Sequence, residues 1–441
     1  MNILSLSRKR SILIFIFLFA ASPVMLATLV LAYLRMFYSF GFKSTPKTYK
    51  GCVLVSGGKM TKALALTRHF SKTGYKVILV ESRKYVFCAH RFSNSVHAFH
   101  TVPDPIKQTR AYELAMLSLI KEYGVNIYVP VASPFSSLVD AQIKKSLEKY
   151  CKVLHFDEDV VRMLDDKYSF CVAAKKAGLS APEVHHITDK NQLRDFDFGA
   201  SGKSFVLKSL CYDSISRLKM PILPTSDMEN LFHQLNISAD RPWILQEYIK
   251  GQELCTHSVV REGRVVLHTT CSSSAFQVNY KHVDHERIEN WVRSFAKFYL
   301  RDGQISFDFM QASDGEIYPI ECNPRTHSAV TVFRNQPCLT SSYLEDSPDN
   351  IVYPMRGERP THWLGHEVWR LTSAKSRQLR SRLWKRLRSG EDAVFEWTDP
   401  LPFVALYYLH IPRLLWQNFR QNKPWLRIDF NIGKLVEEGG D

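Results

Sequence analysis

The chain has 441 residues, of which 45% are hydrophobic and 23% are charged, and its formal net charge is +15. This composition is typical of globular proteins, and it excludes a disordered chain, a collagen and a long coiled coil. The basic excess comes from residues 1–50 and residues 356–388, which flank a neutral body. We therefore expect no nucleic acid partner, because such a partner would need a basic stripe on the body itself.

The N-terminal segment predicts a membrane anchor. An uncharged apolar run over residues 12–34 follows a basic tripeptide, and it meets the ~20 residues needed to cross a bilayer. A cleaved signal peptide would have a shorter apolar region of about 7–15 residues, so we expect residues 1–47 to form a retained anchor and linker. Pro23 leaves a kinked single span and a shallow re-entrant segment both open, and the basic residues on the two sides are too balanced to set the orientation.

Residues 48–157 predict a small, mostly parallel α/β domain that is Rossmann-like. Apolar strands are indicated at residues 52–55, 77–81 and 127–131, and helical patterns that end at glycine lie between them. Strand, helix and strand in that order form a βαβ unit, which favours a parallel sheet.

Cysteine usage indicates a reducing compartment. The chain has nine cysteines, an odd number, and no two of them have CxxC spacing. A disulfide framework or a zinc ribbon would show paired spacings. We therefore expect reduced, mostly buried thiols, as is usual for cytosolic proteins.

Residues 158–345 predict a second domain of mixed α and β structure. One helix is indicated from residue 161 to residue 176, with Gly178 as its C-terminal stop. The strand and helix patterns that follow lie at residues 205–208, 243–249, 259–268 and 286–299. A turn at Glu262-Gly263 interrupts the third of these. The expected fold class is therefore α/β combined with α+β, and residues 346–441 remain as a basic C-terminal extension.

The most informative segment is a pair of alternating strands joined by Asp314-Gly315, a strong signal for a two-residue hairpin turn. With two residues in the turn, Asp308 lies directly opposite Glu321, and the Cβ atoms of opposed residues are only ~4.5–5.5 Å apart. Asn323 is two residues beyond Glu321 and shares its face of the sheet. Opposed like charges destabilise a sheet, and Mg²⁺, which prefers oxygen ligands, would remove that repulsion. The alternative is a solvated outer face on which both carboxylates point into water.

The same hairpin carries a resemblance. Arg325 lies just past the second strand, where it can donate two hydrogen bonds to a phosphate. Asp308 followed by Glu321-Cys322-Asn323-Pro324-Arg325 resembles the metal and phosphate hairpin of the ATP-grasp ligases. The resemblance covers roughly residues 48–340. It implies an ATP-grasp fold with ATP and Mg²⁺ as cofactors, two ions in the usual case and Mn²⁺ as an alternative metal.

The resemblance also assigns the other site residues. Asp308, Glu321 and Asn323 would hold the metal, and Lys208 and Arg325 would be the catalytic residues that act on the transferred phosphate. The residues that it places around ATP are Lys167, Lys208, the hinge strand Gln246, Glu247, Tyr248 and Ile249, and Glu253 on the ribose.

One loop departs from the family pattern. The loop after the phosphate lysine is usually rich in glycine, so that backbone amides can wrap the phosphates. Here residues 209–217 contain no glycine. Closure over ATP would then depend on serine hydroxyls and on Arg217.

A narrower resemblance points to a substrate. Residues 274–280, 323–329, 399–403 and 428–434 are similar to the mycosporine-glycine-forming ligases of cyanobacteria. This implies that ATP phosphorylates the enol oxygen of 4-deoxygadusol, a cyclohexenone that behaves as a vinylogous acid. Glycine would then displace the phosphate to give a C–N bond.

The residues after Arg325 have two interpretations. Thr326, His327 and Ser328 either contact the acceptor or form the N-cap of a helix. Two other functions also remain open for the chain as a whole. One is a different ATP-grasp ligase that joins another acid and amine, and the other is a membrane-tethered nucleotide-binding scaffold without turnover. The oligomeric state is not predicted.

The C-terminal extension predicts a second membrane contact. Trp363, Trp369 and Trp384 alternate with a cluster of arginines, and basic aromatic helices lie readily on anionic membrane surfaces. An amphipathic helix packed on the body is the alternative. Because the implied reaction needs ATP, we place the membrane-anchored catalytic body in the cytoplasm.

Overall fold

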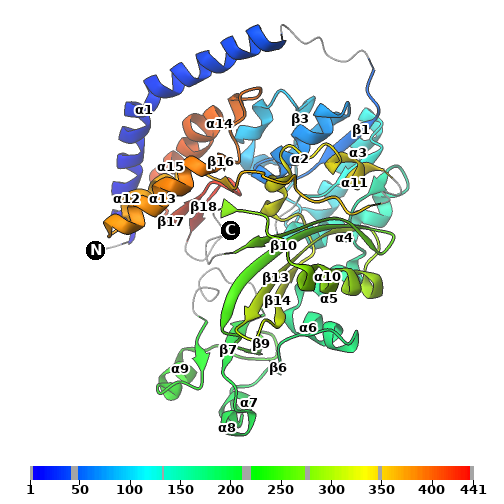
Figure 1. The fold of residues 1–441 in the computed structure, drawn as a ribbon, viewed down its shortest axis with the longest axis vertical. Helices are drawn as coiled ribbons and strands as arrows, with labels where there is room; N and C mark the ends of the chain where they lie inside the picture. The colour runs from blue at the N-terminus through cyan, green and yellow to red at the C-terminus, as the bar shows by residue number, and fades with distance from the viewer. Residues whose placement is uncertain are drawn as a thin grey trace.

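The computed structural model describes residues 3–40, 48–131, 134–210, 220–273, 279–345 and 350–437. Its first sheet, in which Figure 1 labels β1 and β3, has five parallel strands. Their order is β3-β2-β1-β4-β5, which confirms the predicted parallel sheet. The strands are β1 (Cys52–Val55), β2 (Lys76–Ser82), β3 (Ala98–Val102), β4 (Ile127–Val129) and β5 (Lys152–Val153). The longer helices beside them are α2 (Thr61–Lys72), α3 (Thr109–Tyr123) and α4 (Pro134–Leu147).

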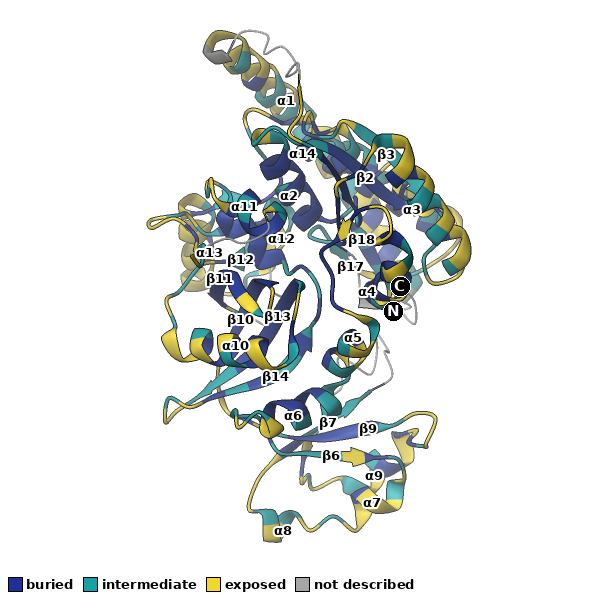
Figure 2. Ribbon diagram, turned by 90° about the vertical axis from the view of Figure 1, so that its right-hand side faces the viewer, coloured by how far each residue is buried: buried dark blue, intermediate teal, exposed yellow. Residues whose placement is uncertain are grey.

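The continuous apolar sequence of β1 follows from helices on both of its faces. Val53 and Val55 pack in one core with α2, whereas Cys52 and Leu54 pack in another with α3. Successive side chains of a strand point to opposite faces, so a strand that is covered on both sides has no polar positions. Figure 2 shows α2 and α3 on either side of the buried strand β2.

The middle of the chain forms two antiparallel sheets, with strand orders β6-β9-β7-β8 and β11-β10-β13-β14. The first contains β6 (Val184–Ile187), β7 (Phe205–Ser209), β8 (Ile222–Leu223) and β9 (Trp243–Glu247), with α7 (Lys190–Arg194), α8 (Phe198–Ser201) and α9 (Met228–Gln234). The second contains β10 (Gly251–Arg261), β11 (Arg264–Ser272), β13 (Gly303–Ala312) and β14 (Ile317–Asn323), with α10 (Glu286–Tyr299). The turn predicted at Glu262-Gly263 joins β10 to β11, and both residues have positive φ, as a tight hairpin requires.

The single helix predicted over residues 161–176 is wrong. The structure has two helices there, α5 (Glu158–Asp165) and α6 (Lys167–Lys176). Asp166 between them is extended, and its carboxylate accepts a hydrogen bond from the amide of Ser169 at 2.7 Å. An aspartate in that position caps a new helix rather than continuing the old one. The break places Lys167 in the first turn of α6.

The C-terminal residues share a core with the first sheet. Phe403, Leu406 and Ile411 belong to the same buried cluster as Val55 and Leu79. The elements here are α12 (Leu364–Ser373), α13 (Arg377–Ser389), α14 (Leu401–Ala405), the π-helical turn η5 (Leu406–His410), α15 (Ile411–Arg420), β17 (Trp425–Asp429) and β18 (Lys434–Glu437). The short elements before and among them are η1 (Arg83–Tyr85), η2 (Ala89–Phe92), β12 (Asn279–Tyr280), η4 (Ser328–Phe333), α11 (Leu339–Leu344), β15 (Thr361–His362) and β16 (Glu391–Asp392).

A buried ion pair ties this C-terminal region to α2. Arg68 is 2% exposed, and its Nε donates to Asp399 Oδ2 at 2.8 Å. The hydroxyl of Ser93 donates to the same oxygen at 2.6 Å. Buried charges are tolerated when they are paired and hydrogen-bonded in this way. The C-terminal region is therefore part of the folded body.

The N-terminal helix α1 (Ile3–Phe40) is continuous through Pro23 and is long and apolar enough to cross a membrane. It also packs on the body, along α15 and β17 (Figure 1). The indole of Trp425 donates to Ser11 Oγ at 3.0 Å, and the hydroxyl of Tyr408 donates to the carbonyl of Leu18 at 3.0 Å. The opposite face of α1 exposes large apolar side chains.

Candidate active site

The site hairpin has a longer turn than the sequence suggests. The amide of Ala312 donates to the carbonyl of Glu316 at 2.8 Å, and the amide of Gly315 donates to the carbonyl of Ala312 at 3.0 Å. The turn between β13 and β14 therefore contains three residues, and the prediction of a two-residue turn is wrong. Gly315 has a φ of 84°, the left-handed conformation that ends a three-residue turn of this kind.

A β-bulge restores the predicted pairing of the carboxylates. Near the turn, Phe309 faces Pro319, one residue out of the predicted register. The register then shifts at Ile320, so that Asp308 faces Glu321 as predicted. β14 lies at the edge of its sheet, where both a proline and a bulge are tolerated.

Two lysines from other elements reach this hairpin. Lys167 Nζ, in the first turn of α6, lies 3.1 Å from Glu321 Oε1. Lys208 Nζ, on β7, donates to Gln246 Oε1 at 2.6 Å, and the amide nitrogen of Gln246 donates to the carbonyl of Ile320 at 3.1 Å. Burial lowers the pKa of Lys208, and the nearby Glu321 partly offsets that shift. The structure therefore brings Lys167, Lys208, Asp308 and Glu321 together.

The residues at the end of β14 form a second polar group. The amide nitrogen of Asn323 lies 3.4 Å from Asp308 Oδ2, and Asn323 Oδ1 accepts a hydrogen bond from Arg325. Arg325 also lies 3.7 Å from Asp165 at the end of α5. Asn323 pairs with Ser306 on β13, so it shares a sheet face with Asp308 and Glu321. The predicted set of metal and phosphate residues is thus contiguous.

The hinge residues lie where β9 leaves one sheet and β10 enters the next. Gln246 is buried and binds Lys208, as above, whereas Tyr248 is exposed and its amide donates to the carbonyl of Ser204 at 2.8 Å. Glu247 forms an ion pair with Lys203 at 3.2 Å. Ile249 follows within the same connection and is buried.

The predicted ribose carboxylate lies near the start of β10. Glu253 accepts a hydrogen bond from the hydroxyl of Ser273 at 3.0 Å. It is two residues from Cys255, which pairs with Asp308, so Glu253 shares the sheet face of the metal residues. Arg217 lies outside the described residues.

The segment after Arg325 is more internal than expected for substrate contacts. Thr326 is buried, and its hydroxyl donates to Gln304 Oε1 at 2.5 Å. His327 caps η4, because its Nδ1 accepts a hydrogen bond from the amide of Ala329 at 3.2 Å. Ser328 Oγ lies 2.9 Å from Asn431 Oδ1, in the C-terminal region. The cap interpretation therefore applies to His327.

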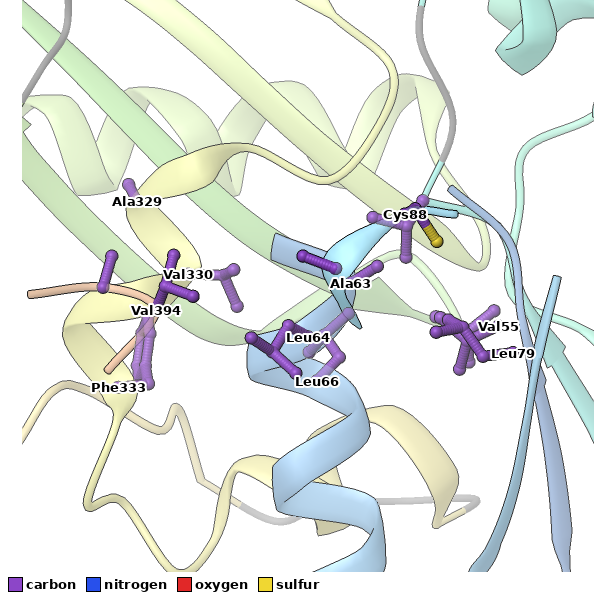
Figure 3. Close-up of a cluster of buried hydrophobic side chains, with 14 of the residues drawn as sticks. Val55, Ala63, Leu64, Leu66, Leu79, Cys88, Ala329, Val330, Phe333 and Val394 are labelled. Atoms are coloured by element: carbon purple, nitrogen blue, oxygen red, sulfur yellow. The ribbon is translucent and has the colours of Figure 1, made fainter. Parts of the chain in front are cut away.

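Sequence reasoning missed Lys62, which the fold brings beside this segment. Lys62 lies in the first turn of α2, and its Nζ donates to the carbonyl of Thr326 at 2.6 Å. Figure 3 shows why: Ala63, Leu64 and Leu66 of α2 pack between the side chains of the first sheet and those of η4. Its position just after β1 was a signal, because ligands bind at the carboxyl ends of parallel strands.

The donor set fits Mg²⁺. Asp308, Glu321 and the side-chain carbonyl of Asn323 supply oxygen ligands, and Mg²⁺ is usually held by one or two carboxylates together with substrate phosphates. Among the described residues, no group of three or more His, Cys, Asp or Glu side chains is placed to hold a metal on its own. A site with two carboxylates and one amide therefore relies on the phosphates of a nucleotide to complete the coordination. The eight cysteines in the described ranges are free thiols, seven of them buried.

Comparison with known proteins identifies the fold. No protein-family model and no curated protein matches the sequence significantly. The structure matches N5-carboxyaminoimidazole synthetase from Staphylococcus aureus, with a TM-score of 0.54 and 14% identity over 71% of this chain and 81% of that one. It also matches the L-amino acid ligase from Bacillus licheniformis, with a TM-score of 0.52 and 13% identity over 68% of this chain and 76% of that one. The chain has the ATP-grasp fold.

A third match extends the range of chemistry on this fold. It is biotin carboxylase from Campylobacter jejuni in complex with β-γ-ATP, with a TM-score of 0.51 and 13% identity over 67% of this chain and 72% of that one. The three named enzymes act on different substrates, and identities this low show the fold alone. The matches therefore establish the fold, and the reaction has to be argued from the site residues.

Proposed function

We propose that this chain is an ATP-dependent ligase that forms a C–N bond between an acid and an amine. The observation that carries the proposal is the convergence on Glu321. Asp308 faces it across the hairpin, and Lys167 reaches it from α6. Lys208 of β7 is close enough for the charge of Glu321 to raise its pKa, against the effect of burial. Two opposed carboxylates with lysines beside them are better explained by the binding of a metal-bound polyphosphate than by a structural role in the sheet.

Each residue then has a role in phosphate transfer. Asp308, Glu321 and Asn323 would hold Mg²⁺, which neutralises the transferred group when it is bound. Lys208 and Lys167 bind phosphate oxygens, and Lys167 leaves its ion pair with Glu321 to do so. Arg325 steadies the charge that develops on the phosphate, because a guanidinium is a planar donor of paired hydrogen bonds. Gln246 to Ile249 and Glu253 contact the nucleoside.

For the substrates we propose 4-deoxygadusol and glycine, with mycosporine-glycine as the product. The support is the similarity of residues 274–280, 323–329, 399–403 and 428–434 to ligases of that reaction. The enol loses its proton, and the resulting enolate oxygen attacks the γ-phosphorus as ADP leaves. The glycine nitrogen then adds to the carbon that carries the phosphate ester, loses a proton, and expels phosphate.

The test is phosphate release by the full chain in detergent, with Mg-ATP and glycine present. Phosphate is expected only when 4-deoxygadusol is added, together with a product of the mass of mycosporine-glycine. The full chain is used because α1 packs on the body. Release with other acids but not with 4-deoxygadusol would replace the substrate and keep the ligase. Nucleotide binding without release for any acid and amine would favour the scaffold function instead.

We further propose that α1 and α13 hold the body on the cytoplasmic face of a membrane. Exposed apolar side chains cover the outer face of α1, and Trp384 of α13 is 50% exposed among exposed arginines. Arg377, Arg380 and Arg388 share a helix face with Trp384 by their spacing. Such a face binds anionic headgroups, and the binding weakens as salt rises.

Vesicle flotation separates the two contributions. The wild-type chain is expected to float with phosphatidylserine vesicles at low salt to a greater extent than a variant with Arg377, Arg380 and Arg388 replaced by Gln. Both proteins are expected to float equally at high salt, where α1 alone binds. Equal flotation of the two at low salt would show that α13 does not contact the membrane, and flotation of neither would exclude the anchor.

A further inference from the structure

Lys62 is a buried cation without a matching acid. It is 5% exposed, and its hydrogen bond is to a backbone carbonyl, that of Thr326. In the part of the chain that the structure describes, no carboxylate oxygen lies within 4 Å of its nitrogen. A buried ammonium that has no counter-charge is costly, and a folded protein keeps one only where something else compensates it.

The charged groups nearest to Lys62 are also cations. Burial lowers the pKa of Lys62 well below its usual value, and the positive charges of Arg325 and Lys59 lower it further. Lys59 has a partner of its own, because its Nζ lies 3.6 Å from Glu81. Arg325 likewise lies 3.7 Å from Asp165. Lys62 is therefore the lysine in this cluster for which the described residues provide no acid.

Two neutral histidines line the same place. Burial lowers the pKa of His327 to about 3, and the positive charges of Lys62 and Arg325 contribute to this shift. Burial also lowers the pKa of His257, and His327 and Lys62 lower it further. His257 Nδ1 accepts a hydrogen bond from the amide of His327 at 3.4 Å, so its proton lies on Nε2, which is 2.9 Å from the hydroxyl of Tyr343. Neither ring adds a negative charge.

An unpartnered hydroxyl connects this place to the metal residues. Ser306 is fully buried, and its Oγ has no hydrogen-bond partner among the described residues. It is two residues from Asp308 and pairs with Asn323, so its side chain shares the face that carries the metal residues. A buried hydroxyl without a hydrogen-bond partner is unusual in a folded protein, and a ligand that accepts a hydrogen bond from it would supply that partner.

We propose that Lys62, Arg325 and Ser306 form the subsite for the anionic oxygen of the acid substrate. The inference rests on the proposed ligase function, and it assigns Lys62 and Ser306, which that function leaves without a role, to the recognition of a carboxylate or an enolate. An anion supplies the counter-charge that Lys62 lacks and accepts a hydrogen bond from the hydroxyl of Ser306. Its oxygen then lies beside the metal residues, which is where a phosphate must be transferred to it. The enol of 4-deoxygadusol, as a vinylogous acid, is such a group.

The test compares Lys62→Met, Lys62→Arg and Lys72→Met in the full chain. Lys72 lies at the other end of α2, is exposed, and pairs with Glu396, so it is the matched control. Loss of a hydrogen bond to a charged group predicts a KM for 4-deoxygadusol that is about 10- to 100-fold higher in Lys62→Met. The KM for ATP and the KM for glycine stay unchanged, Lys62→Arg recovers part of the effect, and Lys72→Met behaves as wild type.

Two results for Lys62→Met would overturn the proposal. One is an equal rise of the KM for ATP, which would assign Lys62 to the nucleotide phosphates, and the other is an unchanged KM for 4-deoxygadusol. Binding of a fluorescent ATP analogue shows whether each variant is folded. If the wild type does not turn over 4-deoxygadusol, malonate and sulfate serve as probe anions in a thermal shift measurement. A rise in the Tm of the wild type that Lys62→Met loses then supports the subsite without the proposed reaction, and no response of the wild type overturns it.

Discussion

Replacing Glu321 by Gln is expected to lower the kcat of the ATP-dependent reaction by about 10²- to 10³-fold, the usual effect of removing one preorganised group that stabilises the transition state. The substitution keeps the shape of the side chain, but it removes the charge that would hold Mg²⁺ and that pairs with Lys167. Phosphate release at saturating ATP measures the effect, and a higher Mg²⁺ concentration should recover part of the rate.

The matched control for this variant is Glu316→Gln. Glu316 lies next to the turn of the same hairpin, is exposed, and pairs with Arg287 at 3.0 Å. Its substitution should leave kcat unchanged, because surface ion pairs contribute little. Because Glu321 directly faces Asp308, Glu321→Gln should not lower the Tm of the nucleotide-free protein. A variant that retains most of its kcat, or a control that loses as much, would remove Glu321 from the reaction.

Acid is expected to unfold this protein between about pH 6 and pH 4.5. Several histidines are buried and neutral, with pKa values lowered by burial to about 3 or about 4. Outside the candidate active site these residues are His69, His90, His155, His268 and His410. Their stabilising contribution is complete above the ordinary histidine pKa of about 6.5 and is lost as the pH falls towards the folded values, because the unfolded chain binds the protons first.

One group opposes this trend. Burial raises the pKa of Asp140 to about 7, so that the folded protein binds its proton before the unfolded chain does. The histidines outnumber it, and near pH 5.5 the unfolded chain binds about four more protons, which corresponds to about 5 kcal/mol per pH unit. A domain with a free energy of unfolding of about 5–15 kcal/mol is therefore lost within about one to three pH units.

Tryptophan fluorescence against pH measures this transition. The variant His155→Gln keeps a donor for the carbonyl of Ser137, which the histidine Nε2 contacts at 2.8 Å, and it should shift the midpoint to lower pH by removing one titrating group. His233→Gln, at an exposed position of α9, is the matched control and should leave the midpoint in place. A protein that keeps its fluorescence to pH 4 would contradict the expectation.

The local parts of the fold could be read from the sequence, because they depend on nearest neighbours. The strand at residues 52–55 and the turn at Glu262-Gly263 were predicted from apolar runs and turn residues alone. The pairing of Asp308 with Glu321 was also right, but two departures cancelled to produce it: one extra residue in the turn and one extra residue in β14. A bulge has no clear signal in a single sequence, so this register could not have been derived securely.

The parts that were missed depend on tertiary contacts. The split at Asp166 could have been found, because aspartate is a strong helix cap, although it also occurs inside helices. Lys62 and Asn431 lie far from the hairpin in the chain, and only the packing of α2 against η4 and the C-terminal residues brings them beside it. The sequence pattern of one segment does not reveal such a long-range contact.

The contacts of α1 have a consequence for how the protein reaches a membrane. Ser7, Ser11 and Ala32 are buried against the body, and Leu18 and Trp425 take part in the hydrogen bonds there. A helix that crosses a bilayer as a single span turns every side towards lipid, so the part of α1 that docks on the body cannot lie in the bilayer at the same time. Insertion would remove Ser11, the hydrogen-bond partner of the Trp425 indole, and would expose α15 and β17. Docking and insertion of α1 are thus competing states. When α1 is docked, it covers the apolar surface of α15 and β17, and when α1 is inserted, something else must cover that surface.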